Sequence, residues 1–297
     1  MAIYRGSMSR IPVVEKQEPG MEEHRIFSGD VELAVHVAGE GDPVLMVHGF
    51  PDDHEVWNEQ IAALVAAGYR VIAPDTRGCG HSSIPADVSV YHITYLIKDM
   101  IAVLDHFGLE KVSLVGHDWG AMIAWRLAIA HPDRFERFAA VSVGHPATLG
   151  AVGKLQMLKS WYIFFFQYRG LGEWMMRGLN WRRLRKLYRS TEDAETAVAR
   201  LSRPGYLTAG INYYRANMGT FAKRNVPSCK GMPVLGIASD GDPWIPDKAL
   251  RETKHFVEGS YQFELIEGAG HWIQRDAPDA FNAVLLEFLG KGRPDKI

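Results

Sequence analysis

The sequence predicts an α/β protein in which helices flank a mostly parallel central sheet and an all-helical lid is inserted between two strands. The first observation is that short, continuous apolar runs alternate with longer segments of helical periodicity. Strands that are buried on both faces of a parallel sheet have such apolar runs. The second observation is that the alternation stops near residue 146 and resumes near residue 231, with helical, aromatic-rich sequence between. We expect the inserted block to cover the carboxyl ends of the strands, where ligands bind in such sheets.

The elements follow in chain order. Residues 31–37 alternate with a period of two and predict a half-exposed antiparallel strand. Buried strands are predicted at residues 43–47, 70–73, 111–115 and 138–143, and helices at residues 57–67, 93–107 and 121–130. After the lid, strands are predicted at residues 234–238 and 261–266, and helices at residues 247–257 and 278–289. We therefore expect an N-terminal tail at residues 1–22, a core in two parts at residues 23–145 and 231–297, and the lid at residues 146–230.

The composition argues against several classes of protein. The chain has 297 residues and a net charge of −2, which gives no electrostatic reason for binding nucleic acid or an anionic membrane. No apolar run approaches the ~18 residues of a membrane span, and residues 1–10 lack the apolar segment of a secretory signal. The two cysteines are too few for a disulfide framework. We expect a soluble, cytoplasmic protein, and the sequence leaves open whether it is a monomer or a homodimer.

A candidate nucleophile stands in the segment Gly116-His117-Asp118-Trp119-Gly120, which follows a predicted strand and begins a predicted helix. Glycines two residues before and two residues after the centre permit a sharp, strained turn. Such a turn pushes the middle side chain out above the sheet, as in a nucleophile elbow, with Asp118 where hydrolases usually carry serine. The alternative is an aspartate that only caps the helix.

A second segment, His-Gly-Phe-Pro at residues 48–51, follows the first buried strand. We expect the backbone N–H groups of Phe50 and Trp119 to form an oxyanion hole above the elbow. A plain turn at the end of the strand is the alternative. His48 and His117 are expected to support these two loops rather than to take part in catalysis.

Two later residues complete a candidate triad. His271 lies between glycines in a loop after the last strand, a suitable place for a general base. Asp242 follows strand 234–238 and is predicted to orient His271 and to stabilise its protonated form. Asp240 competes for this role. Asp242 is favoured because a Pro-Trp-Ile-Pro segment follows it at the spacing usual for this fold.

Together these segments resemble the α/β-hydrolase family, in which the chain order is also nucleophile, acid, histidine. With the lid, residues 27–289 resemble specifically its epoxide hydrolase branch, whose His-Gly-x-Pro loop and Gly-x-Asp-x-Gly elbow match residues 48–51 and 116–120. The resemblance implies that two lid tyrosines activate the epoxide oxygen. These are Tyr214, in the Asn-aromatic-Tyr-Arg segment 212–215, and Tyr162, shortly before Phe166-Gln167. Lid packing is the alternative role for either tyrosine.

An aspartate nucleophile indicates substitution at carbon rather than ester hydrolysis. A carboxylate that attacks an sp3 carbon forms an ester whose carbonyl belongs to the enzyme. Water activated by His271 can then attack Cγ of Asp118 and release an alcohol. An epoxide oxygen leaves as an alkoxide and needs a proton donor, which Tyr162 and Tyr214 can supply. We therefore expect a small apolar epoxide and water as substrates and a vicinal diol as product.

Two other functions remain open. A haloalkane dehalogenase shares the Asp elbow, and Trp119 resembles one of its halide-holding residues, but Phe50 stands where many dehalogenases carry a polar Asn or Glu. Fluoroacetate dehalogenases would carry arginines around the elbow, whereas here the neighbours are Trp119, Ala121 and Met122. The third possibility is a non-catalytic binding protein on this scaffold. It would be favoured by the loss of a triad position, and none is lost.

The remaining predictions concern the pocket and possible ligands. The pocket is expected to include His48, Pro51, His145, Phe165 and Trp272. Residues 181–189 carry five basic side chains and predict a lid helix whose basic face lies in water. No group of histidines and carboxylates has metal-site spacing, and no glycine-rich phosphate loop is present. We therefore expect neither a cofactor nor a metal.

Overall fold

The structure is a computed structural model that describes residues 20–150, 159–221 and 226–291. At its centre is an eight-stranded sheet with the order β1-β2-β4-β3-β5-β6-β8-β10. The pairs β1–β2 and β2–β4 are antiparallel, and the other neighbours are parallel. The strands are β1 (Met21–Ser28), β2 (Val31–Ala38), β3 (Asp42–Val47), β4 (Tyr69–Pro74), β5 (Val112–His117), β6 (Phe135–Val141), β8 (Val234–Ser239) and β10 (Tyr261–Ile266). The predicted fold class is confirmed.

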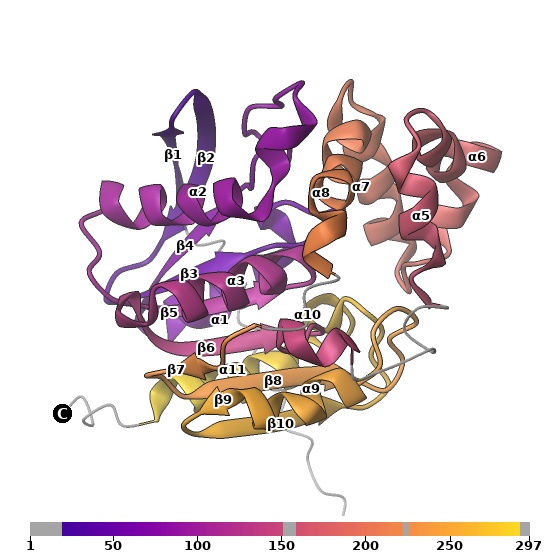
Figure 1. The fold of residues 1–297 in the computed structure, drawn as a ribbon. Coiled ribbons are helices and arrows are strands. Elements are labelled where there is room, and N and C mark those ends of the chain that lie inside the picture. Colours follow the sequence, from indigo (N-terminus) through magenta and orange to yellow (C-terminus); the bar gives the residue numbers. More distant parts are fainter. Residues whose placement is uncertain (1–19, 151–158, 222–225, 292–297) are drawn as a thin grey trace, which may run out of the picture.

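Helices cover both faces of the sheet (Figure 1). One face carries α1 (Asn58–Ala66), α10 (Ile273–Asp276) and α11 (Pro278–Gly290), and the other carries α2 (Ile93–His106), α3 (Trp119–Ala130) and α9 (Lys248–Glu252). Short 3-10 helices lie at η1 (His54–Trp57), η2 (Val88–Tyr91), η3 (Pro132–Arg134), η4 (Pro146–Gly150) and η5 (Thr253–Phe256). In β3, Val44 and Met46 pack into one core and Leu45 and Val47 into the other. This double burial explains the continuous apolar runs in the sequence.

Among the described residues between β6 and β8, four α-helices lie together at one end of the sheet (Figure 1). They are α5 (Trp161–Gln167), α6 (Leu171–Arg185), α7 (Thr191–Ser202) and α8 (Tyr206–Phe221). Residues 178–181 have non-helical backbone angles, so α6 is broken just before the predicted basic segment. Arg182 and Arg183 are exposed there, as expected for a basic face in water.

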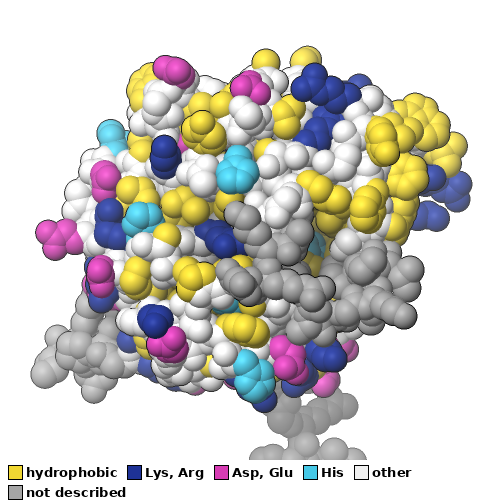
Figure 2. All heavy atoms as spheres, viewed as in Figure 1, with side chains coloured by type: hydrophobic (Ala, Val, Ile, Leu, Met, Phe, Trp, Pro, Cys, Tyr) yellow, Lys and Arg dark blue, Asp and Glu magenta, His cyan; other side chains and the backbone are white. Residues whose placement is uncertain are grey.

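Large apolar side chains are exposed on α5 and α6, where Figure 2 shows hydrophobic groups and arginines or lysines gathered at one end of the molecule. The exposed apolar residues of this end are Trp161, Phe164, Phe165, Tyr168, Leu171, Trp174 and Leu179. In the described residues, no helix is both long and apolar enough to cross a membrane. Cys79 and Cys229 are buried and free.

Three stretches of strand differ from the prediction, and the last of them, β9 (Val257–Glu258), begins inside the predicted helix at residues 247–257. β1 begins at Met21, inside the range expected for the tail, and pairs with the whole of β2. This edge strand was missed because Ile26 is its one buried residue, so the segment has no apolar alternation. β7 (Cys229–Lys230) lies in the segment expected to hold no strand, where it pairs with β9 (Val257–Glu258). A two-residue strand is too short to give a sequence pattern.

Candidate active site

The backbone at Asp118 has the strained geometry of the predicted elbow. Its φ of 52° and ψ of −119° are unusual for a residue with a side chain. The flanking glycines are required, because a Cβ at Gly116 would lie 2.5 Å from the Gly120 oxygen and one at Gly120 would lie 1.9 Å from the Val47 oxygen. The turn places Asp118 at the N-terminus of α3, whose partial positive charge favours the ionised carboxylate.

The loop after β3 lies directly against the elbow, because β3 and β5 are neighbours in the sheet and Val47 pairs with Gly116. The backbone N–H of Phe50 donates to Asp118 Oδ1 over 2.9 Å. A Cβ at Gly49 would lie 2.4 Å from Asp118 Cβ, so this approach also requires glycine. Trp119 follows Asp118 as the first residue of α3, where backbone N–H groups point out of the helix N-terminus. Of the two predicted oxyanion donors, the N–H of Phe50 contacts the Asp118 carboxylate.

His271 lies between two carboxylates. Its Nδ1 donates to Asp242 Oδ2 over 2.7 Å, and its Nε2 lies 3.5 Å from Asp118 Oδ2. The backbone N–H groups of Trp244 and Ile245 donate to Asp242 Oδ1 and fix that carboxylate. The competing residue, Asp240, instead accepts the N–H of Gly268. The loops of Asp242 and His271 meet because β8 and β10 are parallel neighbours.

The charges of this triad stabilise one another. Burial alone would lower the pKa of His271, but the charges of Asp242 and Asp118 and hydrogen bonds to both raise it to about 10. Burial would raise the pKa of each aspartate, yet His271 outweighs it and holds both below their usual value. At neutral pH the resting site therefore holds a protonated His271 between an ionised Asp118 and an ionised Asp242.

Asp118 and His271 open into a mostly apolar cavity of about 130 Å³ between the core and the lid. The lid contributes Tyr162 from α5 and Tyr214 from α8, whose rings lie 6.0 Å apart. The cavity is lined by Phe50, Pro51, Asp118, Trp161, Tyr162, Phe166, Met175, Met176, Arg183, Leu184, Leu187, Tyr214, Trp244, Ile245, His271 and Trp272. Burial first, and then the negative charge of Asp118, raise the pKa of Tyr162. Burial also raises the pKa of Tyr214 well above its ordinary value, so both phenols stay protonated at neutral pH.

The position of Tyr214 depends on its neighbours in α8. The Tyr213 hydroxyl donates to the Arg77 carbonyl over 2.7 Å and accepts from the Thr76 hydroxyl over 2.8 Å. Gly210 allows α8 to pack closely against the loop of residues 48–51, called the oxyanion loop below. Any larger residue would clash, because a Cβ at this position would lie 2.3 Å from the Phe50 ring. Tyr213 and Gly210 were not among the site residues predicted from the sequence. The adjacent tyrosines 213 and 214 were the available signal, since neighbouring residues of a helix point in different directions.

Three expected pocket residues lie elsewhere among the described residues. His48 is buried under its own loop, where its Nδ1 donates to the Gly49 carbonyl and its Nε2 accepts the N–H of Thr76. His145 is buried with its Nε2 donating to the Pro227 carbonyl and its ring stacked on Phe256.

Phe165 is the third of these residues, with 41% of its surface exposed. Tyr162 and Phe166 line the cavity from the same helix. Trp161 of this helix also lines the cavity, but Phe165, four residues further on and in contact with Trp161, does not. By contrast, Pro51 and Trp272 line the cavity as expected. His117 has the expected supporting place, because its Nε2 donates to the backbone carbonyl of His271 over 3.0 Å.

The cavity wall at Trp272 depends on residues that the sequence analysis did not single out. Trp272 Nε1 donates to Asp52 Oδ2 over 2.7 Å, and its ring stacks on Tyr188 with centroids 4.0 Å apart. Burial raises the pKa of Asp52 to about 7, although Arg200, 3.7 Å away, opposes this shift. The single available signal for Asp52 is its place directly after the His-Gly-Phe-Pro segment.

The fold and this site define a class of protein. The sequence profile described as alpha/beta hydrolase fold matches residues 42–278, and the chain belongs to this family. Among curated proteins, the chain is 33% identical to epoxide hydrolase A of Mycobacterium tuberculosis, over 90% of this chain and 97% of that protein. It is 31% identical to epoxide hydrolase 4 of Homo sapiens, over 92% of this chain and 80% of that protein.

Solved structures give the same result. The crystal structure of epoxide hydrolase A from Mycobacterium thermoresistibile matches with a TM-score of 0.79 and 31% identity, over 92% of this chain and 99% of that one. The predicted resemblance to the epoxide hydrolase branch of the family is therefore confirmed.

Proposed function

We propose that the protein hydrolyses an apolar epoxide to a vicinal diol through a covalent alkyl ester on Asp118. The observation that carries this proposal is the composition of the cavity. One mostly apolar space contains an aspartate nucleophile, a histidine 3.5 Å from it and two protonated tyrosines. The relatives named as epoxide hydrolases support the same reaction.

In the first step, Asp118 attacks one carbon of the epoxide. Oδ1 accepts the N–H of Phe50, so Oδ2, which faces His271, is the proposed nucleophile. The new bond joins Oδ2 to carbon, and the C–O bond of the ring breaks. A tyrosine hydroxyl gives its proton to the developing alkoxide. The buried tyrosines suit this role, because a phenol that resists ionisation is available as a donor at neutral pH.

In the second step, water attacks Cγ of Asp118. Formation of the ester removes the negative charge of Asp118, which is one of the causes that raise the pKa of His271. The pKa of His271 then falls, and the proton that it releases restores the tyrosinate left by the first step to a neutral tyrosine. Neutral Nε2 takes a proton from the attacking water, while Asp242 stabilises the imidazolium that forms. The N–H groups of Phe50 and Trp119 hold the charge that develops on the ester oxygen. The bond between Cγ and Oδ2 then breaks, and the departing oxygen takes the proton from His271, which completes the diol. The acid proton left on Asp118 passes to His271 and restores the resting charges.

The proposal is tested with a panel of aryl and alkyl epoxides, with haloalkanes alongside, by measuring diol and free halide. We expect diol from the wild type, none from Asp118→Asn, and a reduced rate from Tyr214→Phe. The His271→Gln variant should stop after the first step, so intact-mass spectrometry should find one alkyl group per chain. Halide without diol would assign the protein to the dehalogenases instead. Diol formation that survives in Asp118→Asn would remove the covalent mechanism.

A further inference from the structure

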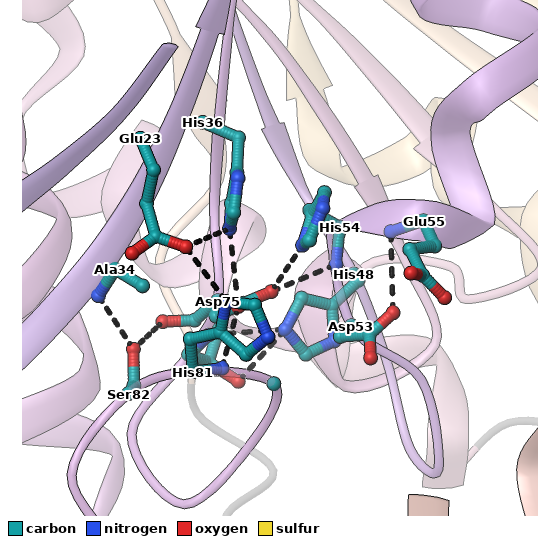
Figure 3. Close-up of polar contacts among 12 residues, drawn as sticks. Glu23, Ala34, His36, His48, Asp53, His54, Glu55, Asp75, His81 and Ser82 are labelled. Carbon is teal, nitrogen blue, oxygen red and sulfur yellow. Dashed lines mark hydrogen bonds and ion pairs between the residues drawn. The ribbon is translucent and has the colours of Figure 1, made fainter. Parts of the chain in front are cut away.

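Outside the catalytic cavity, three histidines and two carboxylates converge at the antiparallel edge of the sheet (Figure 3). Glu23 comes from β1, His36 from β2, His54 from η1, Asp75 from the residue after β4, and His81 from the loop that follows. None of these five described residues lines the catalytic cavity. The reaction proposed above therefore leaves this cluster without a role.

Donor atoms of the cluster have separations that suit a common metal ion. The distance from Glu23 Oε2 to His81 Nδ1 is 2.6 Å, and from Glu23 Oε2 to His36 Nε2 it is 3.9 Å. His36 Nε2 lies 3.3 Å from Asp75 Oδ2. The donor atoms of Glu23, His36 and His81 all lie within 4.8 Å of one another. Ligands bound at roughly 2.0–2.2 Å in a tetrahedral site are roughly 3.3 Å apart, so small side-chain movements would complete the geometry.

We propose that Glu23, His36 and His81 form a binding site for a divalent transition metal of the Zn²⁺ type, with Asp75 beside His36 as an outer partner. Two imidazoles and a carboxylate suit Zn²⁺ and its neighbours in the first transition row. Mg²⁺ and Ca²⁺ prefer oxygen ligands alone. The donor set thus selects the class of ion.

The surroundings of His36 hold its ring in place. His54 stacks on His36 with ring centroids 3.3 Å apart and an angle of 14° between the planes. Asp75 accepts hydrogen bonds from His54 Nδ1 and from the backbone N–H groups of His54 and His81. Asp75 therefore ties the loop of His81 to the strand edge. Such outer partners orient the ligands of metal sites.

The charges around the cluster also favour a cation. Asp75 is fully buried, and its carboxylate oxygens face His36 and His54 at 3.3 Å and 2.8 Å. Arg25 is the competing positive charge, and it contacts Glu23 through Oε1, at 2.5 Å. Oε2, which faces the histidines, is the oxygen assigned to the metal.

A bound ion would join two parts of the fold. Glu23 and His36 belong to the β1–β2 edge, whereas His81 belongs to a loop that also supports the lid, because the Tyr206 hydroxyl of α8 donates to the Gly80 carbonyl over 2.7 Å. The ion would stabilise the folded chain, since the unfolded chain does not hold these distant residues together. The expected signature is therefore a metal-dependent gain in thermal stability.

The test is a calorimetric titration of the metal-stripped full-length chain with ZnCl2, together with thermal unfolding in Zn²⁺ and in Mg²⁺. We expect one Zn²⁺ per chain at this site and a rise in Tm of at least about 2 °C with Zn²⁺ but none with Mg²⁺. The Glu23→Gln and His81→Ala variants should each weaken this binding roughly 10- to 100-fold and lose the rise in Tm. Both side chains are partly exposed, so these variants are expected to fold.

The matched control is His24→Ala, which removes a histidine from the same strand. The ring of His24 packs against Phe107, away from the cluster, so this variant should bind Zn²⁺ like the wild type. Absence of Zn²⁺ binding in the wild type would overturn the proposal. Wild-type affinity in both Glu23→Gln and His81→Ala would also overturn it, because the ion would then bind elsewhere.

Discussion

At the residue scale, the protonated His271 interacts with the carboxylates of Asp242 and Asp118, and this interaction makes the stability of the protein depend on pH. The pKa of His271 is raised from its ordinary 6.5 to about 10, so the folded chain holds this proton more tightly than the unfolded chain. The resulting stabilisation is fully present below about pH 6.5 and is lost as the pH rises towards 10. The lowered pKa values of Asp118 and Asp242 act at acidic pH, outside this window.

We therefore predict that Asp118→Asn reduces the pH dependence of stability between pH 6.5 and pH 10. The substitution removes one of the two charges that raise the pKa of His271 and retains the shape of the side chain. The difference in Tm, wild type minus variant, should be largest near pH 6.5 and should decrease towards pH 10. Melting curves by circular dichroism at several pH values measure this difference. A difference that stays constant across the window would contradict the coupling of the two residues.

At the scale of a single element, α8 determines where Tyr214 lies. The backbone of α8 at Gly210 packs directly against the Phe50 ring of the oxyanion loop. The Tyr213 hydroxyl joins the same helix by hydrogen bonds to the loop after β4. The ring of Tyr214 packs edge-on against Trp119 and Phe50, with centroids 5.2 Å and 5.9 Å away. The tyrosine and the oxyanion loop are thus held as one unit, and movement of the helix would separate them.

This arrangement predicts that Gly210→Ala lowers kcat/KM on the order of 10- to 100-fold for any epoxide that the wild type hydrolyses. The new Cβ would lie 2.3 Å from the Phe50 ring, so either α8 or the oxyanion loop has to move. Gly219→Ala on the same helix is the matched control, because none of the described atoms lies within 4 Å of a Cβ there. That control should retain activity and gain stability from the better helix former. Equal activities in the two variants would refute this role of Gly210.

At the scale of the whole molecule, one buried ion pair connects three parts of the structure. Arg77, in the loop after β4, donates to both carboxylate oxygens of Asp99 in α2 and to the carbonyl of Val90. The carbonyl of Arg77 accepts the hydroxyl of Tyr213 from the lid. Both charged side chains are buried, so removal of one partner leaves the other uncompensated.

We predict that Asp99→Asn lowers the free energy of unfolding by roughly 3–5 kcal/mol. Asp105→Asn is the comparison, because Asp105 pairs with Arg134 on the surface, where about 0–1 kcal/mol is expected. Urea unfolding followed by tryptophan fluorescence measures both values. Similar decreases in the free energy of unfolding in the two variants would mean that the buried pair stabilises the fold no more than the surface pair does.

The sequence was sufficient to predict the strained turn at Asp118 and most of the fold, since these depend on local patterns. The glycines around Asp118 predict the turn because their effect is confined to five consecutive residues. The buried strands were also predictable, because each is apolar along its whole length. The edge strand β1 was missed, since pairing with β2 rather than burial holds it in the sheet.

Other features depend on residues that are far apart in the chain and became visible only in the tertiary structure. It placed His145 and Phe165 outside the cavity, and it brought Glu23, His36 and His81 together from three segments. The spacing of residues along the sequence does not predict which of them meet in space, because strand order and loop packing decide this. The sequence by itself therefore determined the fold class and the chemistry available at the elbow. The tertiary structure decided which distant side chains share a cavity or a cluster, since only packing fixes distances between separate elements.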